Sequence, residues 1–101
     1  MGAEAAAADL HLTVRGIVQG VWFRDGMVQA AAGAGVDGWV RNRPDGTVEA
    51  VLRGAPSARE QVLAWARRGP PAARVERVDT RPARPAESAL VGRGFRRLPT
   101  A

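Results

Sequence analysis

The chain has 101 residues and no cysteine, which limits it to one domain with a single core and excludes disulfides and thiolate chemistry. Its net charge of +5 comes from 15 arginines against 10 acids, without any lysine. Because this bias runs through the whole chain, it is weak evidence for a nucleic-acid partner, and a small anionic substrate would be attracted by the same field.

The first nine residues are mostly alanine and lack the basic segment that begins a signal peptide. We expect a flexible N-terminal tail over residues 1–9 and one folded domain over residues 10–98. No apolar run approaches the roughly 20 residues that cross a bilayer. We therefore expect a cytoplasmic protein without a membrane partner.

Apolar and polar side chains alternate over residues 10–15, which predicts a half-buried first strand. A glycine-containing segment, residues 16–22, then leads into a helix that should begin near Phe23. Unpaired backbone N–H groups converge at the start of a helix, and the two glycines should let that backbone approach an anion. Arg24 in the first turn is repelled by the positive end of the helix. A bound anion would resolve this conflict.

The helix should end at Gly33 or Gly35, and strands over residues 36–42 and 47–53 should form a hairpin around Asp45-Gly46. The spacing of Ser57 and Glu60 predicts a capping box at the start of a second helix, which Gly69-Pro70-Pro71 would close.

Residues 74–80 form the next expected strand, with a bulge or an edge position because Val75 and Val78 break the alternation. A proline-rich connection and a short strand over residues 95–98 follow. The predicted class is α+β: a ferredoxin-like βαββαβ sandwich with an additional short C-terminal strand, a mainly antiparallel sheet and two helices on one face.

Two segments carry a family resemblance over roughly residues 10–98. The first reads Gly-Ile-Val-Gln-Gly-Val-Trp-Phe-Arg over residues 16–24, and the second reads Gly-Trp-Val-Arg-Asn-Arg-Pro-Asp-Gly-Thr-Val over residues 38–48. Together, in this order and at this interval, they resemble the acylphosphatase family. The chain departs from many family members at Met27, where a hydroxyl residue is common, and at Arg43, where a small polar residue is common.

The resemblance implies that the chain hydrolyses acyl phosphates to a carboxylate and inorganic phosphate, without a cofactor or a metal. It implies that Arg24 and Asn42 are the catalytic residues, with Asn42 orienting the attacking water. The phosphate would be bound by Arg24 and by the backbone of Gly16, Ile17, Val18, Gln19, Gly20 and Val21.

The residues also admit structural explanations. On its position alone, Asn42 before a turn would bond its own backbone. Trp22 and Trp39 are expected to be packing or rim residues. His11, the only histidine, should face solvent on the polar side of the first strand. No cluster of acids or histidines has the spacing of metal ligands.

The alternative function is a basic ferredoxin-like RNA-binding module without catalysis. Five aromatic residues give few stacking platforms, and the start of an RNA-recognition motif at Arg93-Gly94-Phe95 is broken by the arginines that follow. Acylphosphatase-like domains fused to larger enzymes suggest a regulatory or carbamoyl-transfer role, but we expect no attached domain because the chain ends at Ala101. We expect a monomer that acts on a small-molecule acyl phosphate and binds no nucleic acid.

Overall fold

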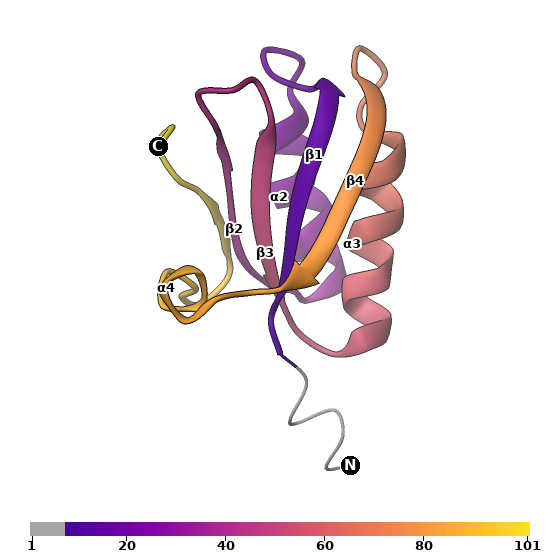
Figure 1. The fold of residues 1–101 in the computed structure, drawn as a ribbon. Coiled ribbons are helices and arrows are strands. Elements are labelled where there is room, and N and C mark those ends of the chain that lie inside the picture. Colours follow the sequence, from indigo (N-terminus) through magenta and orange to yellow (C-terminus); the bar gives the residue numbers. More distant parts are fainter. Residues whose placement is uncertain (1–7) are drawn as a thin grey trace.

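The computed structural model describes residues 8–101, in which one sheet carries its two long helices on a single face (Figure 1). The elements in chain order are β1 (Leu10–Ile17), α2 (Phe23–Ala34), β2 (Asp37–Asn42), β3 (Val48–Arg53), α3 (Pro56–Arg68), β4 (Arg74–Pro82), α4 (Pro85–Ser88) and β5 (Phe95–Arg97). The predicted ferredoxin-like class, with its additional C-terminal strand, is confirmed.

The strand order across the sheet is β4-β1-β3-β2-β5. Neighbouring strands are antiparallel except β2 and β5, which run parallel, with Val40 opposite Arg97. This order places the start of α2, the β2–β3 turn and the end of β1 at the same end of the sheet (Figure 1).

The hydrophobic core lies between the sheet and the two long helices. Alternation puts Leu12 and Val14 of β1 on the helix-facing side, where both are fully buried. Helical spacing does the same for the apolar stripes of α2 and α3. The buried helix residues are Phe23, Met27, Ala31, Val62, Leu63 and Ala66. Met27 is therefore a core residue.

Strand β4 is an edge strand with a bulge, as the broken alternation predicted. Arg15 pairs with Arg77, but Gly16 pairs with Val75, so Glu76 is the extra residue on β4. The bulge lets Val75 and Val78, three residues apart, both pack against the core.

The predicted capping box of α3 is wrong. The N-cap residue is Ala55, no side chain caps the helix, and Pro56 occupies the first turn. A proline fixes φ near its helical value and has no N–H to satisfy, so this start needs no box. Helix α4 was not predicted from the sequence; at its start the Glu87 carboxylate accepts a hydrogen bond from the Arg84 backbone N–H at 2.8 Å.

The predicted N-terminal tail falls largely on residues 1–7, which lie outside the described part of the chain. Its last two residues make contacts: Arg53 donates to both carboxylate oxygens of Asp9, at 2.9 and 2.7 Å, and Arg59 donates to the Ala8 carbonyl. Over residues 8–101, no helix combines the length and the apolar character that crossing a membrane requires.

Candidate active site

A small hollow opens at the N-terminal end of α2. It encloses about 170 Å³ and is lined by Val18, Gly20, Trp22, Phe23, Arg24, Asp25 and Arg97. Of the predicted site residues, Arg24, Val18 and Gly20 lie on it directly. Asn42 is not part of its lining, and no hydrogen bond joins Asn42 to Arg24.

The loop beside the hollow is shorter than predicted. Gly16 and Ile17 belong to β1, where they pair with Val75 and Arg74 of β4, so the loop itself covers residues 18–22. Gly16 has φ +128°, and a Cβ there would collide with the Arg74 carbonyl oxygen. The close approach of β4 therefore explains why position 16 is a glycine.

The loop backbone has the features of an anion cradle. Gly20 has φ +74° and Trp22 has φ 67°, so the chain turns twice through the left-handed region before the helix begins. Within the described residues, the N–H groups of residues 19–22 donate to no backbone acceptor. Such unpaired donors at the positive end of a helix favour an anion.

Arg24 is the second residue of α2 and is half-buried at the hollow. It has no acidic partner within residues 8–101. The position is electrostatically unfavourable for the helix, because the N-terminus carries partial positive charge. An unpaired guanidinium at this position would attract a negatively charged group.

Gln19 connects this loop to the β2–β3 turn. Its side-chain amide nitrogen donates to the carbonyl oxygens of Arg43 and Thr47, both at 2.8 Å. The side chain is therefore committed to the turn, and only the backbone of Gln19 is free to bind a ligand. The same two bonds hold the loop beside the residue that follows Asn42.

Asn42 ends β2, opposite Val48 of β3. Its amide oxygen Oδ1 is buried and has no hydrogen-bond partner among the described residues. A buried polar atom left unpaired costs about 1–3 kcal/mol, so native proteins normally supply it with a partner. A water or a ligand is the partner that suits this oxygen.

The side chain that bonds the backbone of the β2–β3 turn is that of Asp45, and not that of Asn42. The Asp45 carboxylate accepts from the backbone N–H of Thr47 at 3.0 Å and from its hydroxyl at 2.7 Å. These bonds lower the pKa of Asp45, with the hydroxyl bond contributing most. Gly46 supplies the positive φ, +91°, of the turn.

Arg97 lines the hollow, which the sequence did not predict. It ends β5, and its Nη1 lies 2.9 Å from the Asp25 carboxylate. Two arginines and one aspartate thus face the hollow, which leaves an excess of positive charge. Only the parallel pairing of β5 with β2 brings Arg97 here, and no local pattern marks it.

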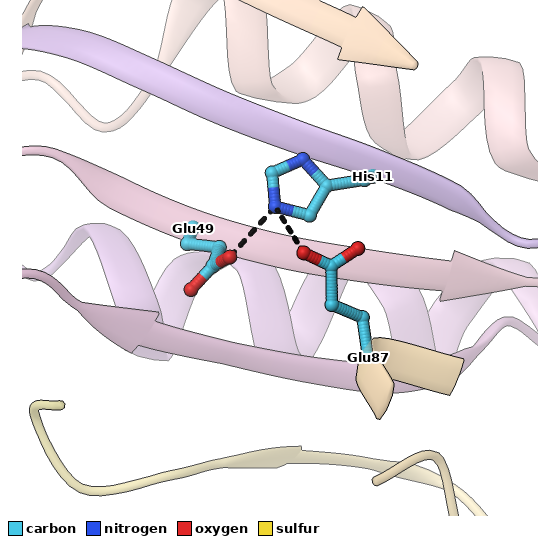
Figure 2. Close-up of side chains that lie close together, drawn as sticks. All are labelled: His11, Glu49 and Glu87. Carbon is cyan, nitrogen blue, oxygen red and sulfur yellow. Dashed lines mark hydrogen bonds and ion pairs between the residues drawn. The ribbon is translucent and has the colours of Figure 1, made fainter. Parts of the chain in front are cut away.

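His11 was expected to face solvent, and this is wrong: only 3% of it is exposed. It does lie on the predicted polar face, but α4 covers that part of the sheet. Its Nε2 lies 2.7 Å from Glu49 and 3.7 Å from Glu87 (Figure 2). Alternation places a side chain on one face of a strand, and it does not tell what covers that face.

The three side chains of His11, Glu49 and Glu87 have metal-ligand atoms within 4.8 Å of one another. Both carboxylates already have cationic partners, however. Arg41 donates to Glu49 at 2.8 Å, and Arg81 donates to both oxygens of Glu87, at 2.9 and 2.7 Å. A divalent cation would have to compete with these guanidinium groups, so the group is better described as an ion-pair network at the end of β1 away from the hollow.

The network shifts both carboxyl groups in the same direction. Burial opposes ionisation of Glu49, but hydrogen bonds from His11 and Arg41 outweigh it and lower its pKa. The Arg81 hydrogen bonds lower the pKa of Glu87 to about 2. Both groups are therefore carboxylates at neutral pH, and Glu87 joins α4 to Arg81 of β4.

The fold and the hollow define a small α+β domain with an unpaired arginine in a hollow at a helix N-terminus. The family model for acylphosphatases matches residues 10–96. An acylphosphatase of Thiobacillus denitrificans is 61% identical over 70 residues, covering 69% of this chain and 79% of the relative. One of Rhizorhabdus wittichii is 48% identical over 90 residues, covering 89% and 87%.

Solved structures agree with the sequence relatives. The crystal structure of acylphosphatase from Bacillus subtilis superposes with a TM-score of 0.80 at 28% identity, covering 91% of this chain and 99% of that one. The chain belongs to the acylphosphatase family.

Proposed function

We propose that the chain hydrolyses acyl phosphates to a carboxylate and inorganic phosphate, with the phosphoryl group held in the hollow at the start of α2. The observation that carries this proposal is the unpaired Arg24 beside N–H groups that donate to no backbone acceptor. Membership of the acylphosphatase family supports the same activity.

Phosphoryl transfer depends mainly on positioning and on stabilising the charge that spreads over the phosphoryl oxygens. In the proposed mechanism, the guanidinium of Arg24 and the N–H groups of the loop, residues 18–22, bind these oxygens. Gly16 and Ile17 support the cradle from β1, where the structure places them. Arg97, which also lines the hollow, adds positive charge.

Asn42 orients the attacking water through its side-chain amide, whose buried oxygen lacks a protein partner. The water oxygen forms a bond to phosphorus as the bond between phosphorus and the acyl oxygen breaks. The electron pair leaves with the carboxylate, and the proton of the water passes to phosphate or to solvent. A carboxylate is a good leaving group, so the step needs neither a strong base nor a protein nucleophile.

The proposed enzyme works without a cofactor or a metal, because Arg24 supplies the charge that a metal ion would otherwise provide. The test is turnover of benzoyl phosphate by the purified chain, with and without EDTA. We expect equal release of benzoate and phosphate in both samples. Absence of turnover would overturn the proposed function, and loss of turnover with EDTA alone would overturn the metal-independent mechanism.

We further propose a cytoplasmic monomer that binds no nucleic acid. A chain without cysteine gains no disulfides from an oxidising compartment. Over residues 8–101 the exposed large apolar side chains are few, namely Ile17, Trp22 and Leu90, so the described surface shows no large apolar interface. Sedimentation, cell fractionation and RNA titration test these three points separately.

A further inference from the structure

Trp22 combines two features that folding does not favour. Its side chain is 75% exposed, and its backbone has φ 67° and ψ 21°, the one positive φ of a non-glycine residue within residues 8–101. It stands at the edge of the hollow, directly before α2.

Neither feature stabilises the fold. An L-residue in the left-handed region loses roughly 1–2 kcal/mol, and glycine or asparagine adopts this conformation more easily. An indole that stays in water also contributes little hydrophobic free energy to folding. The other tryptophans behave as expected: Trp39 is fully buried, and the ring of Trp65 packs 5.1 Å from that of Phe23.

The surroundings of Trp22 indicate what it contacts. The hollow of about 170 Å³ is smaller than pockets that enclose whole ligands, which hold roughly 300–1,000 Å³. It therefore suits a phosphoryl group, and the rest of a substrate must extend past the rim. Ile17, which is 55% exposed, flanks the loop at its other end. Both apolar side chains thus border the loop, although a phosphate needs no apolar contact.

We propose that Trp22 binds the acyl group of the substrate, and that the enzyme consequently prefers acyl phosphates with aromatic or extended apolar acyl groups. The inference rests on the proposed function and specifies its substrate class. The indole offers a large, rigid apolar face, and the left-handed backbone holds it beside the hollow. A substrate such as acetyl phosphate would fill the hollow without reaching this face.

The test compares kcat/KM for benzoyl phosphate with kcat/KM for acetyl phosphate in wild type, Trp22→Asn and Trp22→Phe. Asparagine tolerates the left-handed backbone, and phenylalanine keeps an aromatic ring. We expect the benzoyl-to-acetyl ratio to fall about tenfold in Trp22→Asn and to stay within about threefold in Trp22→Phe, as one aromatic contact predicts. The loss should appear in KM, because the contact is equally strong in the bound substrate and in the transition state.

Leu90→Asn provides the matched control, because Leu90 is also an exposed apolar residue but lies beyond α4, outside the hollow lining. It should leave both substrates unchanged. Equal losses for both substrates in Trp22→Asn would mean that Trp22 only shapes the loop, and an unchanged ratio would mean that it does not contact the acyl group. Either result overturns the proposal.

Binding to the wild-type chain separates this inference from the activity. Calorimetry should show that phenylphosphonate binds about tenfold more tightly than methylphosphonate, and that Trp22→Asn removes the difference. Equal binding of the two ligands by wild type would overturn the role of Trp22 even in an active enzyme. A wild type that binds both with the expected preference but hydrolyses neither acyl phosphate would overturn the proposed function instead.

Discussion

Arg24 occupies the least favourable end of α2 for a cation and has no acidic partner within residues 8–101. We predict that Arg24→Ala lowers kcat/KM for benzoyl phosphate by about 10³ to 10⁵, the range for arginines that stabilise a transferring phosphoryl group. Arg24→Lys should not restore activity, because a point charge cannot grip two oxygens as the planar guanidinium does. Retention of more than a tenth of the wild-type activity by either folded variant would contradict this role.

Asn42 should act mainly on the chemical step. We predict that Asn42→Ala lowers kcat by about 10² to 10³, a typical loss for one preorganised polar group, with little change in KM. Because the amide oxygen has no partner in residues 8–101, removing it should not destabilise the fold. Steady-state kinetics and thermal unfolding check the two parts, and a raised KM at constant kcat would make Asn42 a substrate-binding residue.

At the level of residues, the sequence predicts what is local and misses what depends on distant pairing. Arg24 was placed at the helix start correctly, because glycine spacing and apolar periodicity are local signals. Its catalytic role, like that of Asn42, stays a prediction. Arg97 reaches the hollow only through the pairing of β5 with β2, and His11 is buried only because α4 covers it. Neither fact can be derived from neighbouring residues.

The next prediction concerns the whole loop of residues 18–22, whose backbone N–H groups we expect to bind one anion together. We predict that inorganic phosphate raises the melting temperature of wild type, because a ligand at 100 times its Kd adds about 2.7 kcal/mol to the unfolding free energy. For a domain of this size this corresponds to a shift of about 10 °C or more. Arg24→Ala should show little shift.

Scanning calorimetry with chloride at matched ionic strength is the control for this experiment. Without phosphate, Arg24→Ala should be the more stable protein by roughly 0.3–1 kcal/mol, because a cation no longer opposes the helix dipole. An equal rise of both proteins in phosphate would reflect a general salt effect, and the loop would then not be an anion site.

Most helices and strands could be predicted from the sequence, but the residues at which they begin and end were predicted less accurately. Alternation and helical spacing located the long helices and the strands, and the break at Val75 and Val78 correctly indicated a bulge or an edge position, both of which β4 has. The predicted loop was two residues too long. Gly16 is typical of a loop in the sequence, but in the structure it lies in β1, where its lack of a side chain allows the close approach of β4. Helix α4, only four residues long, has too few positions to show a period.

On the scale of the whole molecule, the ion-pair network joins α4 to the sheet through side chains from β1, β2, β3 and β4. Glu87 contacts Arg81 and faces His11, while Glu49 contacts His11, Arg41 and Arg43. Residues 89–94 connect α4 to β5, which carries Arg97. The network therefore fixes the start of the segment that leads from α4 to β5.

We predict that acid weakens the fold through this network. The pKa of Glu87 falls from its ordinary 4.5 to about 2 in the folded chain, so the unfolded state binds the proton first as the pH drops. The stability that Glu87 contributes is complete above about pH 4.5 and disappears as the pH falls toward 2, and the lowered pKa of Glu49 acts in the same direction.

Glu87→Gln should lower the unfolding free energy at pH 7 by up to about 3 kcal/mol and flatten its decline between pH 4.5 and 2. Urea unfolding at a series of pH values tests this, with Glu60→Gln on the exposed face of α3 as the matched control. If Glu87→Gln lost stability on acidification as steeply as wild type and Glu60→Gln do, the acid response would come from other carboxylates and α4 would owe little to this ion pair.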